Sequence, residues 1–437
     1  MTQAFAWGIA EHRLDNGLRV TVSRDARGPV AAVNLWYDVG SRDDPADGHG
    51  FAHLLEHLMF EGSAQVGRGQ HSAMLAAVGG TEINATTSMD RTNYFQTVPA
   101  SALDLALWLE ADRMGGLALS PEVFDNQRAV VRNERAQQYE SQPYGLWLEF
   151  GLPLVFPGGH PYRRPSMGSP DQLDRAGLAA LDAFRRTHYS PGNAVLTVVG
   201  DVEPEAVFDA ADRYFAGIPG AEQEVGRDAG REPPGRVPVE SWALPGRSVR
   251  TVTDRKASAE RVFVLHRIPP AHTADHDALT VLAAVLGRGR GSRFHRELMA
   301  NRELARAEEK TAFAWELARG SSLFAIGMTV RQGVAAAELL AAQEALLDEL
   351  AVTEVRDEEL GRAKAILAAG WLRSLTPFGA RADLLARYAV QLGEAAAIRE
   401  RQARLAAVSA ADLRRVAGRY LRPENRAVLI LRPDPGA

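Results

Sequence analysis

The sequence contains no cysteine among its 437 residues, so it can form no disulfide bond. It also lacks any apolar run of about 20 residues, the length that a membrane-spanning helix needs. The net charge is only -5, and no long run of like charge occurs. These three absences argue against a membrane-embedded protein and against a main role in binding nucleic acid or a membrane surface.

The first seven residues, Met-Thr-Gln-Ala-Phe-Ala-Trp, carry neither a basic segment nor a long apolar core, so no secretory leader is visible. A cysteine-free chain nevertheless suits an oxidising compartment. We therefore expect a periplasmic protein whose leader has been removed. The alternative is a cytoplasmic protein, since many cytosolic chains also contain few cysteines.

The composition, 46% hydrophobic and 24% charged, is that of a soluble globular protein. The length predicts at least two domains.

The most informative stretch is residues 51–58, where apolar residues recur at the spacing of an amphipathic helix. His53 and His57 are one helical turn apart, so both imidazoles can reach one zinc ion. Glu56 lies on the same side and is free to act as a general base. This is the inverted zincin order, histidine-x-x-glutamate-histidine. The alternative is a chance pattern of two surface histidines.

A second helix, predicted from Ser120 to about Glu140, offers a third zinc ligand. Its inward stripe consists of residues spaced three, four and three apart, namely Phe124, Gln127, Val131 and Glu134. A carboxylate on a face that should be buried needs a compensating partner, and a metal ion provides one. The alternative is that Glu134 pairs with Arg128 or Arg132 on the rim of the same helix.

Periodicity and turn residues predict the remaining elements of the first half. The interval 151–170 has the character of a loop. We expect strands at residues 18–22, 30–37 and 194–200, a strand that begins at 84–87 and continues at 92–98, and helices at 71–77, 102–114, 171–189 and 204–214.

The second half of the sequence repeats the first at an offset near 230. We therefore predict an α+β protein of two homologous domains, residues 1–219 and 241–437, joined by a linker rich in proline, glycine and charge at 220–240. At this offset the positions of His53, Glu56 and His57 are taken by Ala283, Leu286 and Gly287. Only the amino-terminal domain can then hold the metal.

Together these motifs resemble those of the pitrilysin (insulinase-like) zinc metallopeptidases, in particular the half-length branch that includes the mitochondrial processing peptidase. The resemblance covers nearly the whole chain. It rests on Gly50 to His57, Phe60-Glu61-Gly62-Ser63, Gly79-Gly80, Asn84-Ala85-Thr86, Arg128 to Glu134 and His160-Pro161-Tyr162.

The resemblance implies a zinc endopeptidase with one Zn2+ on His53, His57 and Glu134 and with Glu56 as the base. It implies two αβ-roll domains that form half of a clam-shaped chamber. It also implies that peptide substrates add as a strand along Asn84, Ala85 and Thr86, which suits extended or unstructured peptides.

The sequence departs from the family pattern at two places. Gln127 stands where the family often has an acidic residue, and we expect its amide to act by hydrogen bonding around the metal ligands. After the glycine-rich stretch 287–291, to which we assign a structural role, Met299 and Arg306 replace an arginine and a tyrosine that complete the family's active site.

The missing pair predicts a heterodimer, in which a homologous subunit supplies the arginine and the tyrosine. The alternative is a homodimer in which Arg306 or Arg302 substitutes for them. Two other function classes stay open, a non-catalytic scaffold of the same fold and a peptide-binding chamber without cleavage. The intact quartet of His53, Glu56, His57 and Glu134 favours the enzyme.

Overall fold

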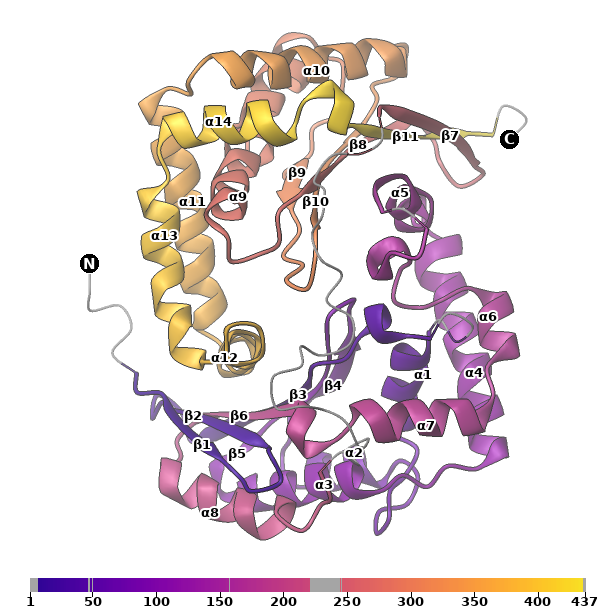
Figure 1. Ribbon diagram of the computed structural model, residues 1–437, viewed down its shortest axis with the longest axis vertical. Coiled ribbons are helices and arrows are strands. Elements are labelled where there is room, and N and C mark those ends of the chain that lie inside the picture. The colour runs from indigo at the N-terminus through magenta and orange to yellow at the C-terminus, as the bar shows by residue number, and fades with distance from the viewer. Residues whose placement is uncertain are drawn as a thin grey trace. The chain divides into compact units, whose positions relative to one another are not determined.

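The computed structural model describes residues 7–45, 48, 50–156, 158–220, 244 and 246–434, and these residues form an α+β protein with two compact units (Figure 1). The first unit contains residues up to 134, 166–233 and 372–400, and the second contains 135–165, 234–371 and 401 onward. Each unit is built on one β-sheet covered by helices.

The first unit has a six-stranded sheet in the order β1-β2-β6-β3-β5-β4. Its strands are β1 (Ala10–Arg13), β2 (Arg19–Arg24), β3 (Val30–Tyr37), β4 (Thr81–Thr87), β5 (Thr92–Pro99) and β6 (Ala194–Gly200). Its helices are α1 (Phe51–Leu58), α2 (Gln70–Ala77), α3 (Leu103–Gly115), α4 (Pro121–Arg135), α6 (Pro170–Arg175), α7 (Leu178–His188), α8 (Pro204–Phe215) and α12 (Phe378–Leu392). Strand β4 is an edge of this sheet.

The second unit has a five-stranded sheet in the order β7-β11-β8-β10-β9. Its strands are β7 (Ser248–Asp254), β8 (Arg261–Ile268), β9 (Ala312–Ala314), β10 (Ser322–Thr329) and β11 (Ala427–Pro433). Its helices are α5 (Trp147–Val155), α9 (Ala274–Gly287), α10 (Ala336–Val352), most of α11 (Asp357–Leu375), α13 (Arg401–Ala407) and α14 (Ala410–Tyr420).

The two sheets confirm the predicted duplication, because the order β2-β6-β3-β5-β4 returns as β7-β11-β8-β10-β9. The pairing directions repeat as well. Strand β2 runs parallel to β6, and β7 runs parallel to β11, whereas β3 and β8 are antiparallel to their neighbours.

The compact units differ from the predicted domain boundaries by an exchange of two helices. Helix α5 of the first repeat packs on β8 and β11 of the second unit, and helix α12 of the second repeat packs on β3 and β6 of the first. The packed units therefore do not coincide with the two repeats along the chain. The predicted linker, residues 220–240, lies outside the described residues except for residue 220.

The prediction of a loop at residues 151–170 is wrong over its first part, because α5 occupies residues 147–155. Gly151 and Pro153 both lie within this helix. In the structure a Cβ atom at position 151 would lie 2.9 Å from Leu265 Cδ1, so the glycine allows the helix to approach β8 closely. Trp147 of the same helix stacks on Phe263 at 4.9 Å.

Other predicted elements hold with adjusted ends. The predicted strands 30–37 and 194–200 have the bounds of β3 and β6. The predicted helix 171–189 is divided into α6 and α7, and the helix expected to run to Glu140 changes from α-helix to a π-helical turn after Arg135. The strand expected to continue from 84–87 into 92–98 is instead two antiparallel strands, β4 and β5, because the chain reverses at residues 88–91. Strand β4 begins at Thr81 and has a register shift before Asn84.

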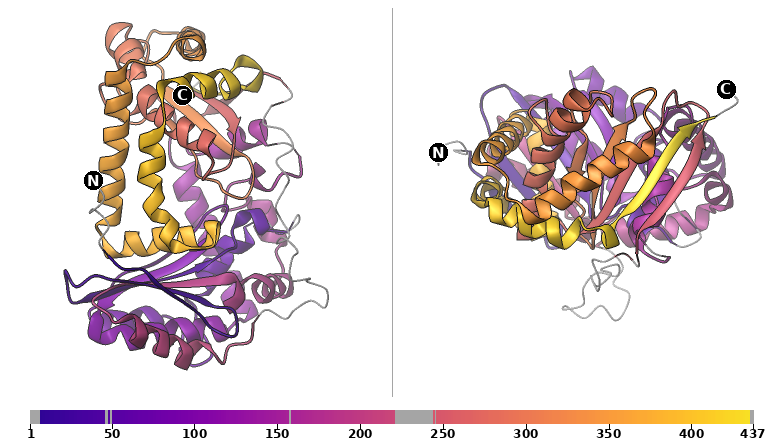
Figure 2. Two further views of the ribbon diagram at one scale, coloured as in Figure 1. Left: turned by 60° about the vertical axis from the view of Figure 1, so that its left-hand side comes forward. Right: turned by 90° about the horizontal axis from the view of Figure 1, so that it is seen from above.

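The sheet of the first unit is covered on both faces, as Figures 1 and 2 show for α12 on one side and α3 and α8 on the other. Alternate residues of β3 follow this division. Ala31, Val33, Leu35 and Tyr37 belong to the main hydrophobic core, whereas the indole of Trp36 donates to Asp383 of α12.

Burial on both faces explains why the sequence of β3 is an almost continuous apolar run. Among the helices of the described residues, none combines the length and the apolar character that a membrane crossing requires.

A candidate metal centre beside an edge strand

Helix α1 begins at a position that Asp44 fixes. The Asp44 carboxylate accepts hydrogen bonds from the backbone N–H groups of Gly50, at 2.7 Å, and Ala52, at 2.9 Å, which satisfies donors of the first turn. Gly50 has φ of +97°, a value that favours glycine. Leu54 and Leu55 are fully buried on the core side of the helix, so the register of His53 and His57 on α1 is set by core packing.

Helix α4 presents the predicted inward stripe. Phe124, Gln127 and Val131 are buried, and Glu134 is half-buried at the end of the stripe. The two arginines considered as alternative partners of Glu134 bind other groups. Arg128 pairs with Asp125 and Arg132 pairs with Asp174.

The structure brings Glu134 to the two histidines of α1. Glu134 Oε2 lies 3.1 Å from His57 Nε2 and 3.7 Å from His53 Nε2. The two imidazole rings are 4.9 Å apart between centroids. One donor atom from each of the three residues lies within 4.8 Å of the other two, and within the described chain this is the sole group of three or more histidine or acidic residues that meets this spacing.

The protonation states suit a metal site. Burial and the neighbouring His57 lower the pKa of His53, Glu134 opposes them, and the resulting pKa is about 4. His53 is therefore neutral near pH 7, as a metal-binding imidazole must be. The hydrogen bond with His57 lowers the pKa of Glu134, so this carboxylate is ionised and can act as a ligand.

The donor atoms of these residues and the neutral form of His53 fit a zinc site. Two imidazole nitrogens and one carboxylate oxygen are a donor set that catalytic zinc sites use, with a fourth position left open. Nε2 of the buried His53 and Nε2 of His57 both face Glu134 Oε2. His53, His57 and Glu134 are therefore the residues that would hold the ion.

Glu56 extends from α1 toward the end of strand β4. The Thr87 hydroxyl, at the end of β4, donates to Glu56 Oε2 at 2.5 Å. Burial raises the pKa of Glu56, and the hydrogen bond from Thr87 opposes this shift. Sequence reasoning did not single out Thr87, because the strand was expected to continue beyond it.

The predicted substrate strand lies on the sheet edge that ends at this threonine. Asn84, Ala85 and Thr86 are consecutive residues of β4, and they pair with β5 on one side only. Their role in binding substrate stays a prediction.

Gln127 lies near this centre, but the partner of its amide was not foreseen. Gln127 Nε2 donates to Glu61 Oε1 at 2.7 Å, and Glu61 also pairs with Arg68 at 2.5 Å. This contact joins α4 to the turn that follows α1. The hydrogen bond therefore links the two helices that carry the candidate ligands.

The second unit offers no comparable site among its described residues. The counterparts of His53 and Glu56, Ala283 and Leu286, are buried in helix α9. Met299 is 6% exposed and belongs to the core of this unit. Arg306 is exposed, and its backbone N–H donates to the carbonyl of Thr329.

Comparison with known proteins gives two matches to models of one peptidase family. Residues 19–148 match "Insulinase (Peptidase family M16)", and residues 176–367 match "Peptidase M16 inactive domain". The chain belongs to the M16 peptidase family. The inactive-domain match falls largely on the second repeat, in agreement with the absence of metal ligands at the equivalent positions there.

Several M16 relatives cover nearly the whole chain. Zinc protease PqqE of Helicobacter pylori is 29% identical over 427 residues, which are 96% of this chain and 92% of that protein. Mitochondrial-processing peptidase subunit beta of Lentinula edodes is 24% identical over 422 residues, 93% of this chain and 86% of that protein. The crystal structure of a protease from Helicobacter pylori has a TM-score of 0.88 at 28% identity and covers 98% of this chain and all of that one.

Proposed function

We propose that this M16 chain is the catalytic subunit of a zinc metalloendopeptidase that cleaves extended or unstructured peptides. One observation carries the proposal. The three candidate zinc ligands and Glu56 meet at the end of an open sheet edge, and Thr87 joins that edge to the base. The non-catalytic scaffold and the chamber that only binds peptide give no reason to retain this complete quartet.

The edge strand accounts for the proposed substrate class. One side of β4 pairs with β5, and among the described residues no strand pairs with the backbone groups of its other side, where the Asn84 side chain accepts from the Ala85 N–H. A peptide that adds there satisfies these groups with its own backbone. Folded proteins are poor substrates, because their backbone groups are already paired.

Glu56 supplies the proton transfers of the proposed reaction. When bound, zinc supplies a Lewis acid that polarises the scissile carbonyl group and lowers the pKa of water. Glu56 accepts a proton from the attacking water as the new C–O bond forms, and it donates this proton to the amide nitrogen as the C–N bond breaks. Thr87 holds the Glu56 carboxylate in place during both transfers.

Metal analysis together with peptide cleavage tests this proposal. We expect about one zinc per chain, and we expect Glu134→Gln to lose both the zinc and the activity because one of three ligands is weakened. Glu122→Gln is the matched control, since Glu122 is exposed in the first turn of the same helix. Stoichiometric zinc in the Glu134 variant, or an absence of cleavage by zinc-loaded chain with any partner, would contradict the proposal.

We also propose that the active enzyme is a heterodimer. Met299 is buried in an apolar core and cannot donate a hydrogen bond to substrate. A homologous subunit that carries the arginine and tyrosine would supply donors for the developing negative charge.

Activity of the chain alone and after mixing with such a subunit decides between the assemblies. Full activity of the chain alone, at a mass that excludes a second polypeptide, would instead support a homodimer in which Arg306 or Arg302 supplies the charge.

A further inference from the structure

Helix α1, which carries three of the four residues of the candidate site, is only eight residues long. A helix of this length is not stable by itself, so its position depends on contacts at its two ends. The Asp44 carboxylate fixes the first turn. The last turn leads into Phe60, whose backbone N–H donates to the carbonyl of His57 at 3.1 Å. A contact that holds Phe60 therefore also holds the turn that contains His57.

The ring of Phe60 lies beside the buried guanidinium of Arg113, a residue of α3. The Arg113 Cζ atom is 5.2 Å from the centroid of the Phe60 ring and 4.2 Å from the centroid of the Tyr94 ring. The centroids of the two rings are 6.0 Å apart. One planar cation therefore contacts both the chain at the end of α1 and a side chain of β5.

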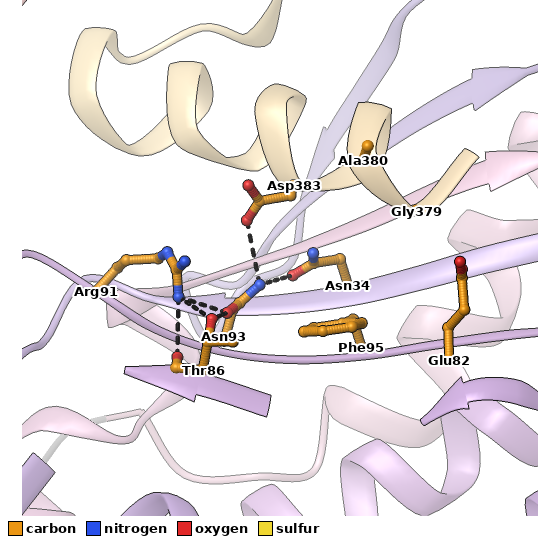
Figure 3. A pocket seen from close by; sticks show the side chains of 9 residues that line it. All are labelled: Asn34, Glu82, Thr86, Arg91, Asn93, Phe95, Gly379, Ala380 and Asp383. Carbon is orange, nitrogen blue, oxygen red and sulfur yellow. Dashed lines mark hydrogen bonds between the residues drawn. The ribbon is translucent and has the colours of Figure 1, made fainter. Parts of the chain in front are cut away.

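Tyr94 connects this contact to the proposed substrate strand. Its neighbours Asn93 and Phe95 point to the α12 side of the sheet, where Figure 3 shows them. Because side chains alternate along a strand, Tyr94 points to the other side, where it belongs to the main hydrophobic core. In the sheet, Tyr94 pairs with Ala85 of β4. Arg113 thus links the metal helix, through Tyr94, to the strand pair that forms the sheet edge.

The charge of Arg113 is balanced inside the protein. Its Nη2 donates to both carboxylate oxygens of Glu110, one turn earlier in α3. Glu110 Oε1 also accepts a hydrogen bond from Gln96 Nε2 of β5 at 2.9 Å. The side chains of Arg113 and Glu110 are 1% and 0% exposed. The ion pair is therefore fully removed from water, and Gln96 attaches it to the same strand as Tyr94.

Stability alone does not account for this buried ion pair. Two of the three guanidinium nitrogens of Arg113, Nε and Nη1, have no hydrogen-bond partner among the described residues. Loss of hydration offsets much of the attraction between two buried charges, and apolar side chains of similar volume often stabilise a protein equally well. A rigid, planar guanidinium can instead fix the separation of two aromatic rings, which a flexible apolar side chain does less closely.

We propose that Arg113 is a positioning residue of the metal site, which holds the last turn of α1 at a fixed distance from β5. The inference rests on the proposed function, because the site that it concerns is the zinc site of that function. Arg113 acts through Phe60 and Tyr94 and takes no part in the chemistry. Without the guanidinium, the end of α1 can shift, and this shift moves His57 relative to Glu134.

The test removes both charges of the ion pair together. In the double variant Arg113→Met/Glu110→Gln no buried charge is left without its partner. Methionine fills much of the volume of the arginine side chain, and the glutamine still offers an oxygen to Gln96. The variant Arg113→Lys is a second probe, since it keeps a positive charge beside Glu110 but lacks the planar group.

A similar buried ion pair in the same unit provides the matched control, Arg381→Met/Asp25→Asn. Arg381 is 1% exposed, pairs with Asp25, and lies 4.9 Å from the centroid of the Trp7 ring and 5.7 Å from that of Phe378. Asp25 follows β2, which β6 and β3 separate from β5 in the sheet. The control therefore removes the same kinds of contact away from α1.

Three quantities are measured for each protein. Urea titration of the zinc-free protein gives the free energy of unfolding, and hydrogen exchange of the zinc-free protein shows how firmly residues 57–62 are held. Competition with a chelator gives the Kd for zinc. In Arg113→Met/Glu110→Gln we expect little change in the free energy of unfolding, exchange at residues 57–62 that is about tenfold faster or more, and a zinc Kd that is roughly ten- to a hundredfold higher. Arg113→Lys should change exchange and Kd in the same direction, and the control should change neither.

An unchanged zinc Kd and unchanged exchange at residues 57–62 in the double variant would overturn the proposal, even if its free energy of unfolding falls. Equal effects of the Arg381 control would overturn it as well. If the double variant does not fold, Arg113→Lys decides, and a wild-type Kd and exchange rate in that variant would again refute the positioning role. A wild-type protein that binds no zinc would contradict the proposed function, whereas exchange at residues 57–62 would still decide whether Arg113 holds the helix.

Discussion

Replacement of Glu56 by glutamine separates metal binding from proton transfer. The two side chains have nearly the same shape, and the glutamine oxygen can still accept the hydrogen bond from Thr87. Glu56 is not one of the three clustered donors, which are His53, His57 and Glu134. We therefore expect Glu56→Gln to keep the zinc of the wild-type protein and to lose its turnover.

The size of the loss follows from the role of the carboxylate. General acid–base catalysis contributes about a hundredfold to ten-thousandfold, or roughly 3 to 5 kcal/mol of activation free energy. Glu56 is half-buried and hydrogen-bonded to Thr87 at the end of β4. Another base therefore cannot readily take its place. We expect a loss of kcat within this range and a smaller change in KM.

The assay combines zinc content per chain, peptide affinity and single-turnover cleavage of one fluorogenic peptide. Zinc content shows whether the metal site survives, and affinity shows whether the strand edge still binds. A variant with full zinc that cleaves at a near-normal rate would refute the assignment of Glu56 as base. Loss of zinc together with activity would show instead that the carboxylate maintains the metal site.

Two further predictions concern stability. Burial raises the pKa of Glu359, but hydrogen bonds from Arg293 and Arg296 outweigh burial and hold the pKa at about 2. The ionised carboxylate therefore contributes about 3 kcal/mol to the free energy of unfolding. This contribution is present above pH 4.5 and is lost as the pH falls toward 2. Urea titrations of wild type and Glu359→Gln should differ at pH 7 and converge near pH 2, and a constant difference would contradict this. Leu385→Ala in α12, a fully buried position, should cost about 2–5 kcal/mol and increase hydrogen exchange in β3. An increase confined to the second unit would show that α12 does not stabilise the first unit.

Local sequence periodicity was sufficient for the elements that carry the candidate site. The spacing of His53, Glu56 and His57 places them on one side of a helix whatever surrounds it, because a turn of α-helix has a fixed pitch. The carboxylate of Glu134 could be recognised by its position on an apolar stripe. Strand β3 was visible as a continuous apolar run because both of its faces are buried.

The tertiary structure decided which elements meet. Nothing in the local pattern of α4 shows that Glu134 reaches the histidines of α1, since that contact depends on how the two helices pack. The exchange of α5 and α12 was also invisible, because an apolar helix fits either of two homologous sheets and the path of the chain selects between them. The hydrogen bond from Trp36 to Asp383 exists only through this exchange, since long-range packing brings together residues that no sequence spacing relates.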